Sequence, residues 1–175
     1  MTGLFKKWLH EQDAVAAIEA ALLVPLMLSI MFGVVDVGMA LNTNQKVVNA
    51  TSTMADLLTR EENVTNDLFN EAVTAGQLTM APYDIGPMGY DVAGIKFLTP
   101  AKTPTVEWRD TFNMEPNPSV TADSTGMGNE NEGVVAVTVK YTYEPFFSSF
   151  VLGAIPMQEV FYARGRKSSF VTRSS

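Results

Sequence analysis

An acidic residue stands at the start of a long uncharged run. Glu19 lies in the stretch VAAIEAALLVPL (residues 15–26), and the sixteen residues from Ala20 to Val35 carry no charge. An ionised carboxylate in lipid is costly unless it is paired or lies close to the headgroups. Leucine would serve a simple anchor better, which indicates that something other than anchoring needs this acid. An acid that lies at the headgroups without a special partner is the alternative.

A second acid, Asp36, ends the uncharged run. The segment from Ala20 to Leu41 has twenty-two residues, roughly 33 Å of helix, which spans a hydrocarbon core of about 30 Å. Asp36 would then lie near the far membrane interface, with a subunit contact as the alternative. Pro25 removes one backbone hydrogen bond and is expected to bend the helix, at a cost that a packed neighbour can offset.

Other groups that could do chemistry are scarce. The chain has no cysteine, which excludes disulfides, a thiolate nucleophile and cysteine metal sites. Its one histidine is His10, so the C-terminal part can hold no Ser-His-Asp triad and no histidine metal cluster. Asp123, Glu130 and Glu132 lack the spacing of an EF-hand, and a solvated acidic loop is favoured over a calcium site. We therefore expect no catalytic residue, no metal and no cofactor.

One long helix is predicted to carry both acids. Apolar residues continue at helical spacing beyond the uncharged run, at Val47, Ala50, Met54, Leu57 and Leu58. We predict a helix from about Val15 to Thr59, which crosses the membrane over residues 15–41 and is amphipathic afterwards. A cleaved secretory signal is disfavoured because an acid opens its apolar region.

The first fourteen residues are predicted to form a short leader. They contain Lys6 and Lys7, whereas Lys46 alone follows soon after the span. This bias favours a cytoplasmic N-terminus and an extracytoplasmic C-terminal part. The net charge of −7 argues against electrostatic binding to nucleic acid or to anionic lipid.

The rest of the chain is predicted to be α+β. An extracytoplasmic helical region at residues 42–81 would include a second helix from Thr65 to Met80, with Thr65 as its N-cap. Its buried face would be formed by Leu68, Phe69, Ala72, Val73 and Leu78.

A small β-rich domain is expected at residues 82–175. Strands are predicted at 90–98, 105–112, 134–146 and 158–163, with a polar connection at 113–133. They would form an antiparallel sheet whose one face packs on the outer half of the long helix. On the third strand one face would carry Val135, Val137, Val139, Tyr141 and Tyr143, and the other face Ala136, Thr138, Lys140 and Thr142. The apolar stretch 146–156 is too short for a second span and is expected to cover one end of the sheet. A patch that meets the membrane surface or another subunit is the alternative.

The N-terminal pattern resembles that of TadE-like proteins, minor pilin-like components of tight-adherence (Flp) pilus systems. The residues that carry the resemblance are Ala16-Ala17-Ile18-Glu19, then Val24-Pro25-Leu26, then Phe32-Gly33-Val34-Val35-Asp36-Val37-Gly38. The resemblance as a whole covers about a third of the chain. Tyr141–Phe146 and Phe161–Arg166 fit the C-terminal outline of the family more loosely.

The resemblance implies a role for the first residues of the helix. Prepilin peptidase would cut between Ala14 and Val15, which makes Glu19 the fifth residue of the mature chain and leaves it to meet the new amino group of a neighbouring subunit. Most prepilins have glycine before the cut, where this chain has the small residue Ala14. Glu19, Pro25 and Asp36 would be the residues of helix assembly and recognition.

The implied function is that of a minor pilin-like (pseudopilin) subunit in the assembly of a type IV-like pilus. Its partners would be the lipid bilayer, prepilin peptidase, other pilin-like subunits and the pilus assembly machinery. It would be a single-pass protein of the inner (cytoplasmic) membrane and not an enzyme. The alternative is an extracytoplasmic binding domain or enzyme that the helix only tethers. A major filament subunit is disfavoured because Flp major subunits are far shorter.

Overall fold

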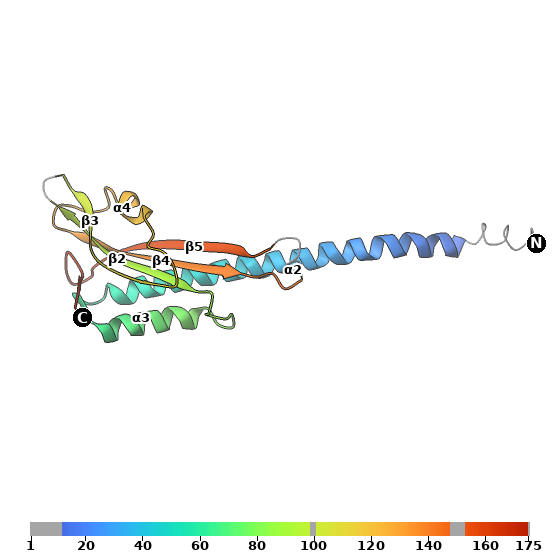
Figure 1. The fold of residues 1–175 in the computed structure, drawn as a ribbon, viewed down its shortest axis with the longest axis horizontal. Helices are drawn as coiled ribbons and strands as arrows, with labels where there is room; N and C mark the ends of the chain where they lie inside the picture. The colour runs from blue at the N-terminus through green and yellow to red at the C-terminus, as the bar shows by residue number, and fades with distance from the viewer. Residues whose placement is uncertain (1–11, 99–100, 148–152, 175) are drawn as a thin grey trace, which may run out of the picture.

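A long helix projects from a small α+β unit (Figure 1). The computed structural model describes residues 12–98, 101–147 and 153–174, so the predicted leader lies almost entirely outside the described residues. The α+β fold class predicted from the sequence is confirmed. The elements are α2 (Gln12–Leu58), β1 (Asn63–Val64), α3 (Asn66–Thr79), β2 (Gly89–Leu98), β3 (Thr103–Phe112), α4 (Ser119–Asp123), β4 (Gly133–Tyr143), β5 (Ile155–Arg164) and β6 (Thr172–Arg173).

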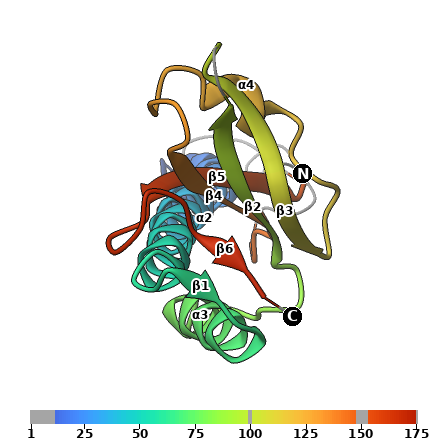
Figure 2. The same cartoon turned by 90° about the vertical axis from the view of Figure 1, so that its left-hand side faces the viewer.

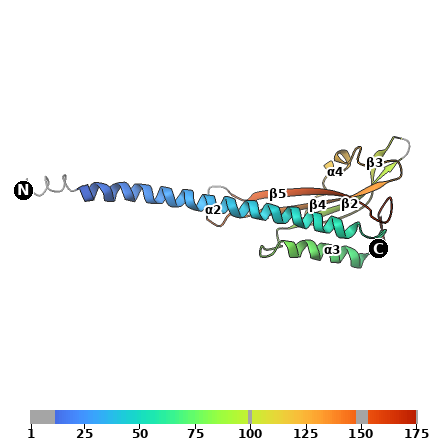
Figure 3. The same cartoon turned by 180° about the vertical axis from the view of Figure 1, so that it is seen from behind.

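Helix α2 is continuous over 47 residues and contains Pro25. Its buried positions begin only at Asp36 and then recur at three- and four-residue intervals, which is the spacing of one helix face. They are Asp36, Ala40, Thr43, Val47, Ala50, Thr51, Met54, Ala55 and Leu58. We call the part of the chain from Asp36 onward the head. The remainder of α2 extends away from the head (Figure 3).

Helix α3 lies beside the head portion of α2 (Figure 3). Thr65 caps it as predicted, because its hydroxyl accepts a hydrogen bond from the backbone N–H of Leu68. The prediction that Leu78 belongs to the buried face was wrong, since its side chain is 71% exposed. Gly76 occupies the buried face instead. A Cβ atom there would lie 2.6 Å from Cγ of Met54, so the two helices approach closely only because residue 76 is glycine.

The four predicted strands form one antiparallel sheet in the order β3-β2-β4-β5. The first three lie close to their predicted bounds, although β4 ends at Tyr143, before Glu144. The fourth was predicted at 158–163 and is longer at both ends. Register places Val137 of β4 opposite Val92 and Phe161. The central strands β2 and β4 therefore carry most of the buried side chains.

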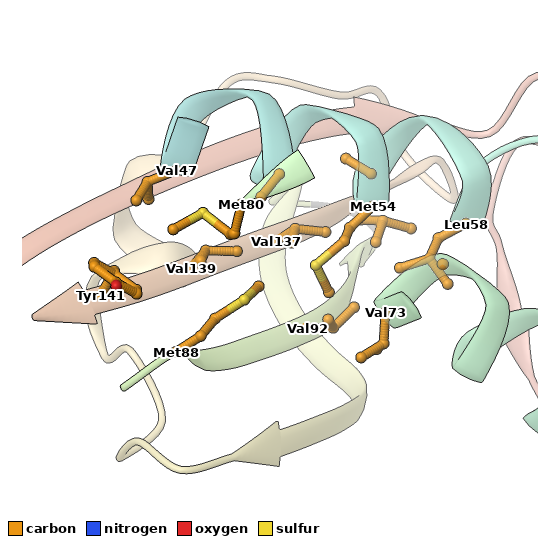
Figure 4. Close-up of a cluster of buried hydrophobic side chains, with 14 of the residues drawn as sticks. Val47, Met54, Leu58, Val73, Met80, Met88, Val92, Val137, Val139 and Tyr141 are labelled. Carbon is orange, nitrogen blue, oxygen red and sulfur yellow. The ribbon is translucent and has the colours of Figure 1, made fainter. Parts of the chain in front are cut away.

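One face of the sheet packs on α2 and α3 (Figure 4). The predicted alternation in β4 is confirmed, because every second residue from Val135 to Tyr143 is buried in this core. Helix α2 contributes Val47, Ala50, Met54 and Leu58 to the same cluster. At the usual 1.5–3 kcal/mol for burial of each large apolar side chain, this interface is the main stabilising contact of the head.

The opposite face of the sheet is covered by the connection between β3 and β4 (Figure 2). The sequence predicted only a polar connection there, yet α4 places Val120 against Ile95 and Phe97. A buried ion pair also lies on this face. Asp91 accepts hydrogen bonds from Nε and Nη2 of Arg109 at 2.8 and 2.7 Å, and from the backbone N–H of Asn117 at 2.8 Å.

The C-terminal residues bind back to the region just after α2. Strand β6 pairs in parallel with β1, a two-stranded sheet that was not predicted (Figure 2). The indole N–H of Trp108 donates to the carbonyl of Val171 at 2.8 Å. Arg173 binds Asp110 at 3.0 Å and lies over the ring of Phe69. The segment therefore ties β3 of the sheet to β1 and α3.

Candidate functional site in the N-terminal helix

The apolar first part of α2 is exposed in the single chain. Every described side chain from Val15 to Met31 is exposed, and the most apolar stretch has none of its residues buried. Within the described residues, α2 is the one helix long and apolar enough to cross a membrane. Exposure of so much apolar surface is unfavourable in water. Together with its length, this indicates that the helix anchors the protein in a membrane.

Glu19 is exposed within this apolar segment. The described residues provide no hydrogen-bond or ion-pair partner for its carboxylate. It lies seventeen residues before Asp36, roughly 25 Å along the helix axis. The head begins at Asp36, so a partner for Glu19 has to come from outside the described chain.

Pro25 is also exposed and does not interrupt α2. Ser29, one turn further on, donates its hydroxyl to the Pro25 carbonyl at 2.8 Å. That bond keeps the serine hydroxyl satisfied inside an apolar segment, which matters where no water is present. Helix α2 also runs unbroken through the Ala14–Val15 junction, and Val15 is exposed.

Asp36 lies in a different environment from Glu19. Its side chain is buried, with 1% of the residue exposed. Its Oδ1 accepts from the backbone N–H of Phe146 at 3.2 Å, and its Oδ2 accepts from the backbone N–H of Phe147 at 3.0 Å. Asp36 is therefore paired inside the chain, where it holds the end of β4 against α2, and its place near the far membrane interface stays a prediction.

An aromatic contact reinforces this junction. The rings of Phe147 and Phe32 stack with centroids 4.6 Å apart and planes 9° from parallel. Phe146 packs edge-on against Phe147 at 4.9 Å. Sequence reasoning did not identify these three phenylalanines as a unit, and the only signal was the Phe146-Phe147 pair at the start of the apolar stretch 146–156.

That apolar stretch was expected to cover an end of the sheet. Residues 148–152 of this prediction lie outside the described residues. Phe147 packs on α2, and Ile155 and Pro156 belong to strand β5. Where the structure describes it, the stretch therefore lies against the helix or within the sheet, and the prediction of a cover was wrong there.

The predicted site residues do not converge on one pocket. Ala14, Val15, Glu19, Pro25 and Asp36 follow one another along α2, and of these Asp36 alone is buried among the residues whose exposure is described. The arrangement suits contacts distributed along a helix and offers no enclosed space for a substrate.

An open recess of about 630 Å³ lies elsewhere, between the end of α2 and β5. Its charged groups are paired, because Asp56 binds both Arg60 and Arg166. The hydrogen bond from Arg60 lowers the pKa of Asp56 below its usual value, burial opposes this shift, and the charge of Arg166 adds to it. A carboxylate held ionised by two guanidinium groups is a poor general base at neutral pH.

The acidic loop that was weighed as a calcium site is used in another way. Glu132 accepts hydrogen bonds from the backbone and side chain of Asn129 and lies 3.7 Å from Arg164. The hydrogen bond from the Asn129 backbone is the main cause that lowers the pKa of Glu132. No group of three metal-ligating side chains occurs in the part of the chain that the structure describes.

Comparison with known families bears on the N-terminal segment. Residues 14–56 match the model of a family described as TadE-like protein. The matched range contains Ala14, Val15, Glu19, Pro25 and Asp36, so the resemblance seen in the sequence is confirmed over this part of the chain. Neither the curated proteins nor the solved structures contain a match.

Proposed function

We propose that this chain is a minor pilin-like (pseudopilin) subunit that takes part in assembly of a tight-adherence pilus through its N-terminal helix. The TadE-like match over residues 14–56 supports this role. A structural component is consistent with a site that consists of a projecting helix and has no enclosed substrate pocket. The protein would carry out no reaction itself.

The contrast between the two acids of the helix carries the proposal. Both flank the same uncharged run. Asp36 accepts hydrogen bonds from the backbone of the head, whereas Glu19 is exposed at the other end of the run and would face lipid in a membrane. A buried carboxylate without a partner destabilises strongly, and a positive group within hydrogen-bond reach offsets that cost. The amino group of Val15 in a neighbouring processed subunit would be such a group.

Processing and topology complete the proposal. Removal of residues 1–14 by prepilin peptidase would create the Val15 amino group, and Ala14 is small enough for this position. The lysines Lys6 and Lys7 favour a cytoplasmic N-terminus, which places the head outside the cytoplasmic membrane. Helices of several subunits would then pack along their exposed apolar surfaces.

Two measurements test this function. The intact mass of the protein extracted from its native membrane should lack residues 1–14. The variant Glu19→Leu should be processed and inserted but should abolish its part in piliation. Ser29→Leu is the matched control, since it also replaces an exposed polar residue of the same span. An unprocessed chain whose Glu19→Leu variant supports normal piliation would instead indicate a tethered extracytoplasmic domain.

A further inference from the structure

Phe146 and Phe147, which follow β4, contact α2 at the outer end of its apolar, membrane-spanning part. Phe32 belongs to the uncharged run that ends at Val35, four residues or roughly 6 Å before Asp36 along the axis. Phe147 stacks directly on Phe32. Any bilayer that contains Phe32 therefore also reaches the ring of Phe147.

The uncharged run is shorter than the hydrocarbon core, so a bilayer that covers the run also contains Phe32. Sixteen uncharged residues span roughly 24 Å, less than a hydrocarbon core of about 30 Å. A core centred on the run would extend about 3 Å, or two residues, beyond each end, so it would include Phe32 and end just past Asp36. The hydrocarbon boundary then coincides with the point where the head meets α2.

The polar groups at this junction are arranged for an environment with little water. A backbone N–H in lipid must have a partner, and the N–H groups of Phe146 and Phe147 both donate to Asp36. The carboxylate in turn obtains two donors. Each side thus supplies the hydrogen bonds that water would otherwise provide.

The side chain of Phe146, in contrast to these polar groups, is exposed. Phe146 is 78% exposed and packs edge-on against Phe147. It continues the apolar surface of α2, where Met31 and Val34 are exposed as well. Transfer of this apolar side chain from water into hydrocarbon is favourable.

We propose that the head carries a second membrane contact, in which Phe146 and Phe147 insert into the lipid leaflet around the outer end of α2. The occupant is the acyl-chain region of that leaflet. This contact would fix the height and tilt of the head on the bilayer. It requires that α2 spans a membrane and does not depend on assembly into a pilus.

Spin labelling of the full chain in vesicles tests the contact directly. The chain has no cysteine, so a single nitroxide can be attached through Phe146→Cys. Leu78→Cys is the matched control, because Leu78 is 71% exposed on α3, and Ile30→Cys reports on the span itself. The vesicles contain phosphatidylethanolamine and phosphatidylglycerol at a low protein-to-lipid ratio. Collision with oxygen, which concentrates in hydrocarbon, is compared with collision with a water-soluble nickel complex.

We expect the label at residue 146 to collide more with oxygen than with the nickel complex, as at residue 30, and the label at residue 78 to show the reverse. Nickel accessibility at residue 146 equal to that at residue 78 would overturn the proposal. Shielding from both reagents would also overturn it, because protein would then cover the aromatic pair. A water-exposed label at residue 30 would show that the span itself is wrong, and the proposal would fall with it.

A second measurement uses the unaltered chain in case the label disturbs the junction. In vesicles that contain a phospholipid with a photoactivatable acyl chain, adducts should form on Phe146 or Phe147 and not on Leu78. Adducts on α2 without any on the aromatic pair would overturn the contact while leaving the membrane helix in place.

Discussion

Replacement of Asp36 should release the end of β4 from α2. Asp36→Leu removes the acceptors of two backbone N–H groups, those of Phe146 and Phe147. Hydrogen bonds to a charged group contribute about 1.5–3 kcal/mol each, and the lower value applies because both donors are only partly buried. Loss of both bonds therefore costs about 3 kcal/mol. That corresponds to a rise of roughly 100-fold in the population of the detached state.

Hydrogen exchange measures this population. The protein in detergent micelles is labelled in deuterated buffer and fragmented to resolve the amides of Phe146 and Phe147. Asp36→Leu should accelerate their exchange roughly 100-fold. Asp36→Asn keeps one acceptor oxygen but loses the charge, so it should cost about 1 kcal/mol and accelerate exchange roughly fivefold.

The control is Glu144→Gln, which removes a charge from an exposed residue close by and takes no acceptor from either amide. Wild-type exchange rates at Phe146 and Phe147 in Asp36→Leu would refute the reasoning. So would an equal acceleration in Glu144→Gln, because the effect would then come from net charge and not from the two hydrogen bonds.

Three further outcomes are expected. Asp91→Ala leaves Arg109 without its carboxylate and should destabilise the head by about 3 kcal/mol, measured by denaturant titration of the protein in micelles; a loss below 1 kcal/mol would contradict this. Met54→Ala opens a cavity between α2 and the sheet and should cost about 2–5 kcal/mol in the same titration. The hydrogen bond from Arg60 lowers the pKa of Asp56, so the stability that this carboxylate provides is present above its unfolded pKa of about 3.9 and is lost as the pH falls through the lower folded value. Asp56→Asn should therefore reduce the loss of stability on acidification below about pH 5 and leave the alkaline side unchanged.

The elements that sequence predicted well are those with strong periodicity. Helix α2 has apolar residues on the head side at every third or fourth position from Val47 to Leu58, and β4 alternates from Val135 to Tyr143. These two patterns face each other in the core (Figure 4). Each pattern predicts its own element and also indicates that one of its faces is buried. Together they predict an antiparallel sheet packed on the helix.

The connection between β3 and β4 shows why other parts could not be predicted. Its composition is that of turns, and α4 has only five residues, too few for a periodic signal. Burial of Val120 depends on contact with Ile95 and Phe97 of β2, which are distant in sequence. The pairing of β6 with β1 likewise joins residues more than a hundred positions apart. Such long-range contacts leave no local pattern.

Leu78 illustrates a different error, in which the helical spacing itself was misjudged. At about 100° per residue, Leu78 lies about 180° around α3 from Phe69, on the side opposite the buried face that Phe69, Val73 and Gly76 form. It therefore faces away from the core. The side chain that fills the contact is Met54, supplied by the other helix.

The two acids of α2 look alike in the sequence but lie in different environments in the structure. Both border one uncharged run, and both would be costly in lipid without a partner. The structure places them roughly 25 Å apart and brings the backbone of Phe146 and Phe147 to Asp36 alone. The head therefore stabilises one carboxylate internally and leaves Glu19 exposed on the apolar helix. We predict that a second molecule offsets the cost of keeping Glu19 there. We therefore expect two separate phenotypes. Glu19→Leu should lose assembly alone, and Asp36→Leu should loosen the head alone.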